Sequence, residues 1–263
     1  MRSTLHVLPI EKTNVRRFLD FLDEDRILHI FTIYDLRFMR NKTKVWAALE
    51  NDEMRGYLFE FDKRIIHTRG QTEGITELLD YISLEEPVMV IEPHHLAVIE
   101  KSFKPVEPTD ASSKGKITTY LVMKTNAETF QPSIKHRFKK LEAEDLDEVS
   151  ERIGEGWAKR VEDAIRRGMA FGAYERDSLA SLATVPEIIE DIAFVRGVYT
   201  VPSLRSKGLA TSATSALIEE LISLDKEAIL WVAKANTPAR KVYEKIGFRK
   251  TGQVLLGFKA RRL

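Results

Sequence analysis

The stretch Arg205-Ser206-Lys207-Gly208-Leu209-Ala210 decides how this chain folds, because a strand-like run comes before it and a helical run follows it. The run 195–201 is rich in β-branched residues, and the run 209–224 is amphipathic. A strand, a tight glycine turn and a helix together aim free backbone N–H groups at an anion such as a phosphate. Gly208 lets the backbone approach that anion closely, and the two cations of the stretch add positive charge.

A further pair of segments along the chain strengthens this interpretation. The strand-like run 228–233 leads into Asn236 to Phe248, which reads NTPARKVYEKIGF. Pro238 suits the first turn of a helix, and Gly247 suits its end. The sequence therefore predicts another strand and helix after the glycine turn.

The glycine turn and the segment 236–248 together resemble the GNAT superfamily of acetyl-CoA-dependent N-acetyltransferases. The glycine turn resembles its R/Q-x-x-G-x-G/A diphosphate loop, and 236–248 is similar to its N-x-x-A-x-x-x-Y-x-x-x-G-F helix, in the same order and spacing. The motifs cover 195–248, and a looser resemblance covers 134–263. The resemblance implies an α/β (α+β) fold, with a mixed, mostly antiparallel GNAT-type sheet flanked by helices.

Composition excludes several other classes of function. The chain has 263 residues, 43% of them hydrophobic and 31% charged, and its formal net charge is +1. This balance gives no reason to expect a nucleic-acid partner. The absence of cysteine excludes disulfides, thiolate nucleophiles and cysteine-ligated metals. No run has the length of a signal peptide or of a membrane span, so we expect a cytoplasmic protein without a membrane partner.

The pattern predicts two lobes in tandem, with 1–125 as a degenerate copy of the GNAT-like lobe, 126–133 as a linker and 134–263 as the catalytic domain. Helices and strands are expected in a similar order in both halves. In the C-terminal half, strands are expected at 138–141, 169–174, 179–185, 192–201, 228–233 and 254–259, and helices at 146–153, 157–167, 209–224 and 238–248. In the N-terminal half, strands are expected at 45–49, 57–61, 65–68, 88–91 and 117–123, and helices at 13–22, 27–38, 75–82 and 94–102.

The N-terminal half carries a near-copy of the diphosphate loop, Gln71-Thr72-Glu73-Gly74-Ile75-Thr76. Glu73 places a carboxylate where Lys207 stands in the C-terminal half, and Thr76 replaces the small Ala210. A carboxylate at that place would repel a phosphate. We therefore expect the N-terminal half to be a degenerate repeat that binds no cofactor. The alternative to a repeat is an unrelated α/β lobe in which the similar spacing arises by chance.

The resemblance implies that acetyl-CoA is the cosubstrate and that two segments hold it. Backbone N–H groups of the turn would bind its diphosphate, and the edge of the preceding strand would pair with its pantetheine arm. A free N–H at Val198 would stabilise the oxyanion that develops on the thioester carbonyl. The residues implied for cofactor binding are Val198, Tyr199, Thr200, Arg205, Ser206, Lys207, Gly208, Leu209, Ala210, Thr211 and Asn236.

Tyr243 is the candidate general acid, by its place in the 236–248 motif. A tyrosine has an ordinary pKa of about 10, comparable to that of an alkyl thiol, so its proton can pass to the leaving sulfur at little cost. A packed tyrosine with its hydroxyl bonded elsewhere is the alternative. Asn236 is either a cofactor contact or a simple helix cap.

The general base is not identified by the pattern. Many members of the superfamily carry a glutamate on the strand before the loop, and Phe194 stands at that position here. Glu190 or Asp191 acting through water, or ordered water alone, are the alternatives. His94 and His95 suggest no metal site, because neighbouring residues of a helix point about 100° apart.

These observations favour an acyltransferase that moves an acetyl group from acetyl-CoA directly to a primary amine of a small molecule or amino acid. The two-lobed arrangement resembles the glycine N-acyltransferase-like branch. A protein or peptide amine is the alternative acceptor, and a non-catalytic acetyl-CoA sensor is the alternative function. The sequence does not identify the acceptor, the acyl chain or the oligomeric state.

Overall fold

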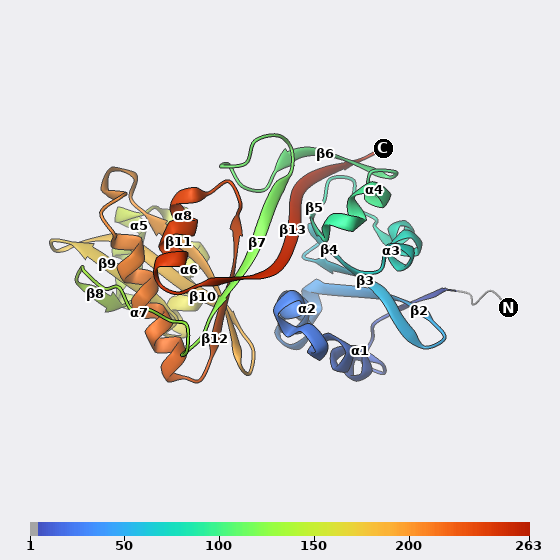
Figure 1. Cartoon of the computed structure of the whole chain (residues 1–263), viewed down its shortest axis with the longest axis horizontal. Helices are drawn as coiled ribbons and strands as arrows, with labels where there is room; N and C mark the ends of the chain where they lie inside the picture. The colour runs from blue at the N-terminus through green and yellow to red at the C-terminus, as the bar shows by residue number, and fades with distance from the viewer. Residues whose placement is uncertain (1–4) are drawn as a thin grey trace. The chain divides into compact units, whose positions relative to one another are not determined.

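The computed structural model describes residues 5–263, which form two compact units (Figure 1). Unit 1 holds the described residues up to Val122, together with Val232–Asn236 and Gly252–Leu263. Unit 2 holds Met123–Trp231 and Thr237–Thr251. Three strands have residues in both units, namely β7 (Thr118–Thr125), β12 (Glu227–Ala233) and β13 (Arg249–Arg262).

Unit 1 is built on antiparallel strands with one parallel pair. Its strands are β1 (His6–Pro9), β2 (Thr43–Glu50), β3 (Glu53–Phe61), β4 (Ile65–Gly70), β5 (Val88–Ile91) and β6 (Phe103–Pro108). Its α-helices are α1 (Val15–Leu22), α2 (Arg26–Phe38), α3 (Thr72–Leu78) and α4 (Leu96–Ile99). Short 3-10 turns are η1 (Asp23–Asp25), η2 (Arg40–Lys42), η3 (Leu79–Tyr81) and η4 (Pro93–His95). Strands β1 to β4 pair antiparallel in sequence, and β5 joins β4 in parallel through the crossover helix α3.

The last strand of the chain completes unit 1. Leu256 to Lys259 of β13 pair with β5, and Phe258 to Arg262 pair with β6. The expected strand 254–259 therefore pairs with strands of unit 1. Strand β6 is absent from the expected strands. Its two prolines, Pro105 and Pro108, are tolerated because its described pairing is with β13 alone, as at a sheet edge.

The two faces of β4 carry different side chains, because successive residues of a strand point to opposite faces. One face packs an apolar cluster that includes Leu58, Ile66, Ile75 and Met89. The other face is polar and buried: His29 Nδ1 lies 2.7 Å from the Tyr57 hydroxyl, and Arg69 is only 1% exposed.

Acid is expected to destabilise unit 1 through its buried histidines. Burial lowers the pKa of His29 to about 3 and the pKa of His67 well below its usual value of 6.5. Both rings stay neutral in the folded state, while unfolded imidazoles take up protons below pH of about 6.5. Because the unfolded state then binds more protons, the free energy of unfolding should fall as pH drops through that value, by roughly 2 kcal/mol per histidine at pH 5.

Urea unfolding at pH 7 and pH 5 measures this loss. His29→Gln should reduce the difference between the two pH values, and His6→Gln, at an exposed position of β1, should leave it unchanged. An undiminished difference in the His29 variant would show that the acid sensitivity arises elsewhere.

Unit 2 repeats the strand order of unit 1. Its strands are β8 (Phe138–Lys140), β9 (Ala170–Glu175), β10 (Ser178–Ile188) and β11 (Ile192–Thr200), with the first part of β12. Its helices are α5 (Leu146–Arg152), α6 (Glu155–Arg166), α7 (Leu209–Ser223) and α8 (Thr237–Lys245), with 3-10 turns η5 (Ala143–Asp145) and η6 (Pro202–Leu204). Strands β8 to β11 pair antiparallel, and β12 joins β11 in parallel through α7 (Figure 1). The expected mixed, mostly antiparallel sheet flanked by helices is confirmed.

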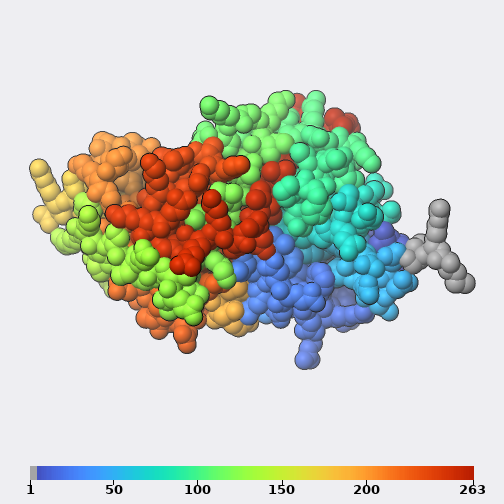
Figure 2. Space-filling view, in the orientation of Figure 1, coloured from blue at the N-terminus to red at the C-terminus, as the bar shows by residue number. Residues whose placement is uncertain are grey.

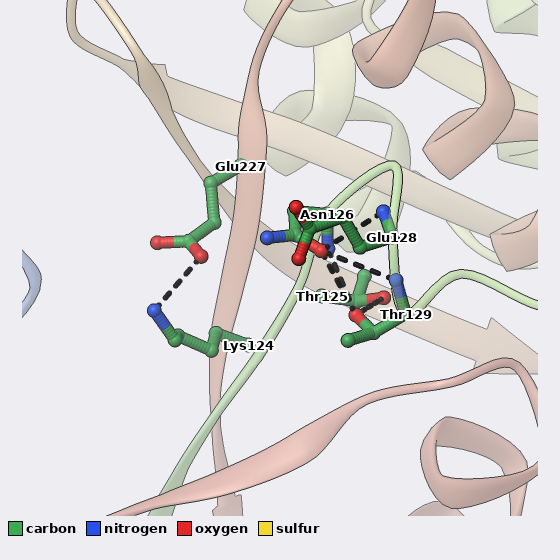
Figure 3. A network of polar contacts seen from close by, with 6 residues as sticks. All are labelled: Lys124, Thr125, Asn126, Glu128, Thr129 and Glu227. Atoms are coloured by element: carbon green, nitrogen blue, oxygen red, sulfur yellow. Dashed lines mark hydrogen bonds and ion pairs between the residues drawn. The ribbon is translucent and has the colours of Figure 1, made fainter.

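The segment 126–133, expected to be a linker, belongs to unit 2 and is packed there. Figure 3 shows its first turn, in which Asn126 Oδ1 accepts hydrogen bonds from the backbone N–H groups of Glu128 at 3.1 Å and Thr129 at 3.2 Å. Beside it, Lys124 Nζ lies 3.0 Å from Glu227 Oε1.

The rest of this segment lies against the end of α8. The backbone N–H of Gln131 donates to Ile246 O at 3.1 Å. Figure 2 shows yellow-green atoms of this part of the chain beside red atoms of its C-terminal part. A Cβ on Gly247 would lie 2.0 Å from Thr129 O, so this glycine is required by the close approach as well as by its φ of +98°.

The expected division at 125 and 134 therefore differs from the observed units. The first change of unit follows Val122, and 252–263 returns to unit 1. Residues 1–4 of the expected first lobe lie outside the described residues. None of the helices described between residues 5 and 263 combines the length and the apolar composition of a membrane span.

Candidate functional site

Strands β11 and β12 pair over a short stretch only. Their parallel register runs from Ile192 opposite Glu227 to Phe194 opposite Ile229, although both strands continue beyond these residues. From Arg196 onward, β11 is exposed or half-buried, whereas the residues before it are buried. In unit 1, by contrast, the β4–β5 pairing reaches the last residue of β5, at Thr68 opposite Ile91. An opening between parallel strands is thus specific to unit 2 among the described residues.

A β-bulge lies in β11 where this opening begins. Leu182 pairs with Tyr199, and Thr184 pairs with Arg196. Between these two pairs, β10 advances by two residues while β11 advances by three. Gly197 has φ of +69°, and a Cβ there would lie 2.8 Å from Thr184 Oγ1. A bulge leaves its extra residue out of the ladder. This is the backbone arrangement that a free N–H at Val198 requires.

Side chains on β10 hold the bulged strand in place. Thr184 Oγ1 donates to Arg196 O at 2.6 Å, and Ser181 Oγ donates to Tyr199 O at 2.6 Å. The Trp157 ring of α6 packs on the Tyr199 ring, with centroids 4.8 Å apart. The strand edge is therefore fixed before any ligand arrives.

The glycine turn leads directly into α7, as the sequence predicts. Gly208 is the N-cap residue with φ of +90°, and no side chain caps this end of the helix. The N–H of Ser212 donates to Gly208 O at 3.0 Å, so it is bonded within the helix. The N–H groups of Leu209, Ala210 and Thr211 belong to the first turn, whose donors have no partner in the helix itself. A Cβ on Gly208 would meet only His136 Nε2, at 3.8 Å, so the space in front of the turn is open.

Four hydrogen bonds hold the turn. His136 Nε2 donates to Lys207 O at 2.8 Å, and the backbone N–H groups of Lys135 and His136 donate to Ser212 Oγ at 3.0 and 3.2 Å. Lys207 Nζ donates to Glu175 Oε1 at 2.7 Å. The ammonium group expected to add charge to the phosphate site is thus paired with a carboxylate of β9.

The other members of the turn lie at its surface. Arg205 and Ser206 are exposed, and Ser206 has φ of +65°. The Arg205 guanidinium lies 5.9 Å from the centre of the Tyr199 ring, and its Nε donates to Thr200 O at 3.3 Å. The turn and the strand edge expected to bind the cofactor are therefore joined by direct contacts.

Tyr243 is the one buried residue of α8, with 9% of its surface exposed. Its ring packs on Phe248, with centroids 5.7 Å apart, and its hydroxyl makes none of the hydrogen bonds recorded among residues 5–263. Burial raises the pKa of Tyr243 to about 12. The hydroxyl therefore keeps its proton at neutral pH and is uncommitted.

Asn236 lies next to the helix that carries Tyr243. It directly precedes α8, where a helix cap stands, and it belongs to unit 1. Its backbone N–H donates to Ala233 O at 2.8 Å. Its expected contact with the cofactor stays a prediction.

The two carboxylates expected as candidates for the base lie at the wrong end of β11. Asp191 comes before the first residue of the strand, seven residues from Val198, which is about 23 Å along an extended chain. Glu190 is one residue further away. Phe194, at the position where a base was sought, is buried and packs edge-on against Trp231, with ring centroids 5.4 Å apart. Ordered water is the alternative that remains.

Sequence reasoning missed the residues that shape the bulge and brace the turn. The glycine at 197, inside a β-branched run, was the available signal, because an isolated glycine in a strand often marks a bulge. Thr184 and His136 carry no such signal, because their roles arise from partners 12 and 71 residues away.

Comparisons with known proteins agree with this architecture. Residues 170–255 match the family described as FR47-like protein. No curated protein matches the chain.

Several solved structures are similar over nearly the whole chain. An acetyltransferase of the GNAT family from Colwellia psychrerythraea is 14% identical, with 97% of this chain and 99% of that chain covered and a TM-score of 0.59. A GCN5-related N-acetyltransferase from Sphaerobacter thermophilus is 12% identical, with 98% and 96% covered and a TM-score of 0.64. A tandem GNAT protein from the clavulanic acid biosynthesis pathway is 13% identical, with 98% of both chains covered and a TM-score of 0.60.

At these identities the similar structures show the fold, and the family match covers the segment that carries the opening, the bulge and the glycine turn. The chain thus has the GNAT fold, and its residues 170–255 match the FR47-like family.

Proposed function

We propose that this protein is an N-acetyltransferase that moves an acetyl group from acetyl-CoA to a primary amine of a small molecule or amino acid. One observation carries the proposal: the β11–β12 pairing ends at Phe194, next to a bulge and an uncapped helix N-terminus. An extended ligand arm can pair with such a free strand edge, while a diphosphate accepts hydrogen bonds from the helix end.

The residues of the turn suit a diphosphate. The first N–H groups of α7 point out of the helix, and the open space in front of Gly208 leaves room for an anion. The edge of β11 from Val198 to Thr200 would pair with the pantetheine arm. In unit 1 the β4–β5 pairing continues to the last residue of β5, which supports a single cofactor site per chain.

Acetyl-CoA would supply the acetyl thioester, and the chain would supply the groups that act on it. The amine nitrogen bonds to the acetyl carbon as the carbon–sulfur bond breaks. The N–H of Val198 would stabilise the negative charge that develops on the carbonyl oxygen. The Tyr243 hydroxyl would give its proton to the leaving sulfur, and water would take the proton of the amine.

The surface beside the bulge favours a small acceptor with an anionic group. The Trp157 and Tyr199 rings lie at the bulge, and the Arg160 guanidinium lies 5.8 Å from the centre of the Trp157 ring. Arginine recognises carboxylates through paired hydrogen bonds. An amino acid, which carries an amine and a carboxylate, fits this combination. The resemblance to the glycine N-acyltransferase-like branch is proposed on the same grounds.

A thiol-release screen with acetyl-CoA tests the function. Amino acids, their carboxamides, polyamines and peptides serve as acceptors. We expect release of free thiol with amino acids in preference to their carboxamides. Turnover with peptides alone would favour the protein acetyltransferase. Binding of acetyl-CoA without thiol release for any amine would favour the sensor.

The cytoplasmic location expected from the sequence stays a prediction.

Replacing Glu175 with glutamine is expected to strengthen acetyl-CoA binding. The hydrogen bond from Lys207 lowers the pKa of Glu175, so this carboxylate is ionised beside the phosphate site. Glu175→Gln removes that negative charge and frees the ammonium group. For an exposed pair we expect a Kd about two- to fivefold lower, with a larger effect at low salt.

The matched control is Asp177→Asn, which removes an exposed carboxylate two residues away that pairs with Arg137 at 3.0 Å. Calorimetry should find its Kd for acetyl-CoA equal to that of the wild type. An unchanged or higher Kd in the Glu175 variant would mean that the Lys207–Glu175 pair does not compete with the ligand.

A further inference from the structure

Glu92, His94 and His95 form a cluster of metal-ligating side chains at the end of β5 in unit 1. The expectation that the two neighbouring histidines point apart is wrong. Pro93 opens a 3-10 turn, η4, rather than an α-helix, and the two imidazole rings lie with centroids 4.2 Å apart.

All three side chains converge on the peptide groups of one residue, Gly70. His94 Nε2 lies 2.9 Å and His95 Nε2 lies 2.8 Å from Gly70 O. Glu92 Oε2 accepts a hydrogen bond from Gly70 N at 2.9 Å. One ligand atom from each side chain lies within 4.8 Å of the others, and the other carboxylate oxygen makes no recorded hydrogen bond among residues 5–263.

The carbonyl at the centre of the cluster is held rigidly. Gly70 has φ of +110°, and a Cβ there would lie 2.5 Å from the Cα atom of Gly56. Only glycine fits this position. The carbonyl oxygen therefore has a fixed place among the two imidazoles and the carboxylate.

A buried hydroxyl orients the inner histidine. His95 is fully buried, and its Nδ1 lies 2.9 Å from Oγ1 of Thr68, which is also fully buried. Histidines that bind metals through one ring nitrogen usually hydrogen-bond a polar group through the other. With Nδ1–H donating to Thr68 Oγ1, the Nε2 lone pair is left for a cation.

The charge of the ligand set suits a cation, because one carboxylate and two imidazoles in their neutral form sum to −1. A buried cation, Arg69, lies on the opposite face of β4, because it alternates with Thr68 and Gly70, and it interacts electrostatically with Glu92 and His95. Its guanidinium donates to the backbone carbonyls of Thr68 and Val90 at 2.9 and 3.0 Å.

We propose that Glu92, His94 and His95 bind one zinc ion, with Gly70 O or a water molecule as the fourth ligand. Two imidazole nitrogens and oxygen ligands in a four-coordinate set are typical of zinc. Zinc binding involves no change of oxidation state. In the zinc-bound form each neutral imidazole would carry its proton on Nδ1, which leaves Nε2 free to bind the ion. The ion would join the end of β4 to the turn after β5, the place where the corresponding strands of unit 2 separate.

Zinc titration of the metal-free full-length protein tests this site. Calorimetry and elemental analysis should find one zinc per chain, and zinc should raise the melting temperature. His94→Gln should lose this binding; it is expected to fold, because His94 is exposed and glutamine can still donate to Gly70 O. Thr68→Val, which keeps the shape but removes the partner of Nδ1, should raise the Kd about 10- to 100-fold.

His6→Gln is the matched control, because it removes an exposed histidine of β1 and should leave zinc binding intact. Glu92→Gln is an independent test that keeps both histidines, and it should also lose the site. Equal zinc binding by the wild type and the His94 variant, or no binding by the wild type, would overturn the proposal.

Discussion

Gly208→Asp is expected to abolish acetyl-CoA binding. The substitution places a carboxylate in the open space in front of the first turn of α7, where the diphosphate would lie. Two like charges about 4 Å apart repel each other by about 4 kcal/mol at an effective dielectric constant near 20. The Kd measured by calorimetry should therefore rise at least about 100-fold.

Gly252→Asp is the matched control. Gly252 has φ of +95°, close to the +90° of Gly208, and a Cβ on it would meet nothing within 4 Å. It reproduces both the backbone strain and the added charge in a segment outside the glycine turn, so its Kd should stay near that of the wild type. Equal weakening in both variants would trace the effect to strain rather than to the phosphate site.

Tyr243→Phe is expected to lower kcat by about 100-fold or more while KM for acetyl-CoA changes little. The variant keeps the ring that packs on Phe248 and removes only the hydroxyl. Because this hydroxyl makes no recorded hydrogen bond within residues 5–263, its loss should cost little stability. Steady-state kinetics with an acceptor from the thiol-release screen gives both constants.

Tyr174→Phe is the control for this measurement. Tyr174 is also buried in unit 2, burial raises its pKa to about 12 as well, and its hydroxyl donates to Glu148 at 3.4 Å. Its kcat should stay within a few-fold of the wild type. A near-wild-type kcat in the Tyr243 variant would return that tyrosine to a packing role.

Local patterns predicted the elements around the site well. The helix after the glycine turn was expected at 209–224 and spans Leu209–Ser223, because a positive-φ glycine and a long amphipathic run are both local signals. Gly247 was predicted at the end of the next helix for the same reason, and it lies two residues after the last residue of α8, Lys245. The strand at 103–108 was missed because its prolines oppose strand formation locally, and pairing with β13 overrides that preference.

Long-range contacts decided what local patterns could not predict. The last strand pairs with β5 and β6, far away in sequence, so the chain divides into units that its linear order does not reveal. A fragment beginning at residue 134 would lose the first eleven residues of unit 2, which include the packed segment that caps α8, and would keep the strand that completes unit 1.

The sequence by itself determined the glycine turn and the two motif helices, because turn geometry and side-chain periodicity act between residues a few positions apart. The mostly antiparallel sheet was implied by the resemblance of these motifs to a known superfamily. Only the tertiary structure decided that β11 separates from β12 after Phe194, that Lys207 is held by Glu175, and that His94 and His95 meet at Gly70. Each of these depends on partners more than 20 residues apart. Such contacts form only when the strands and helices pack.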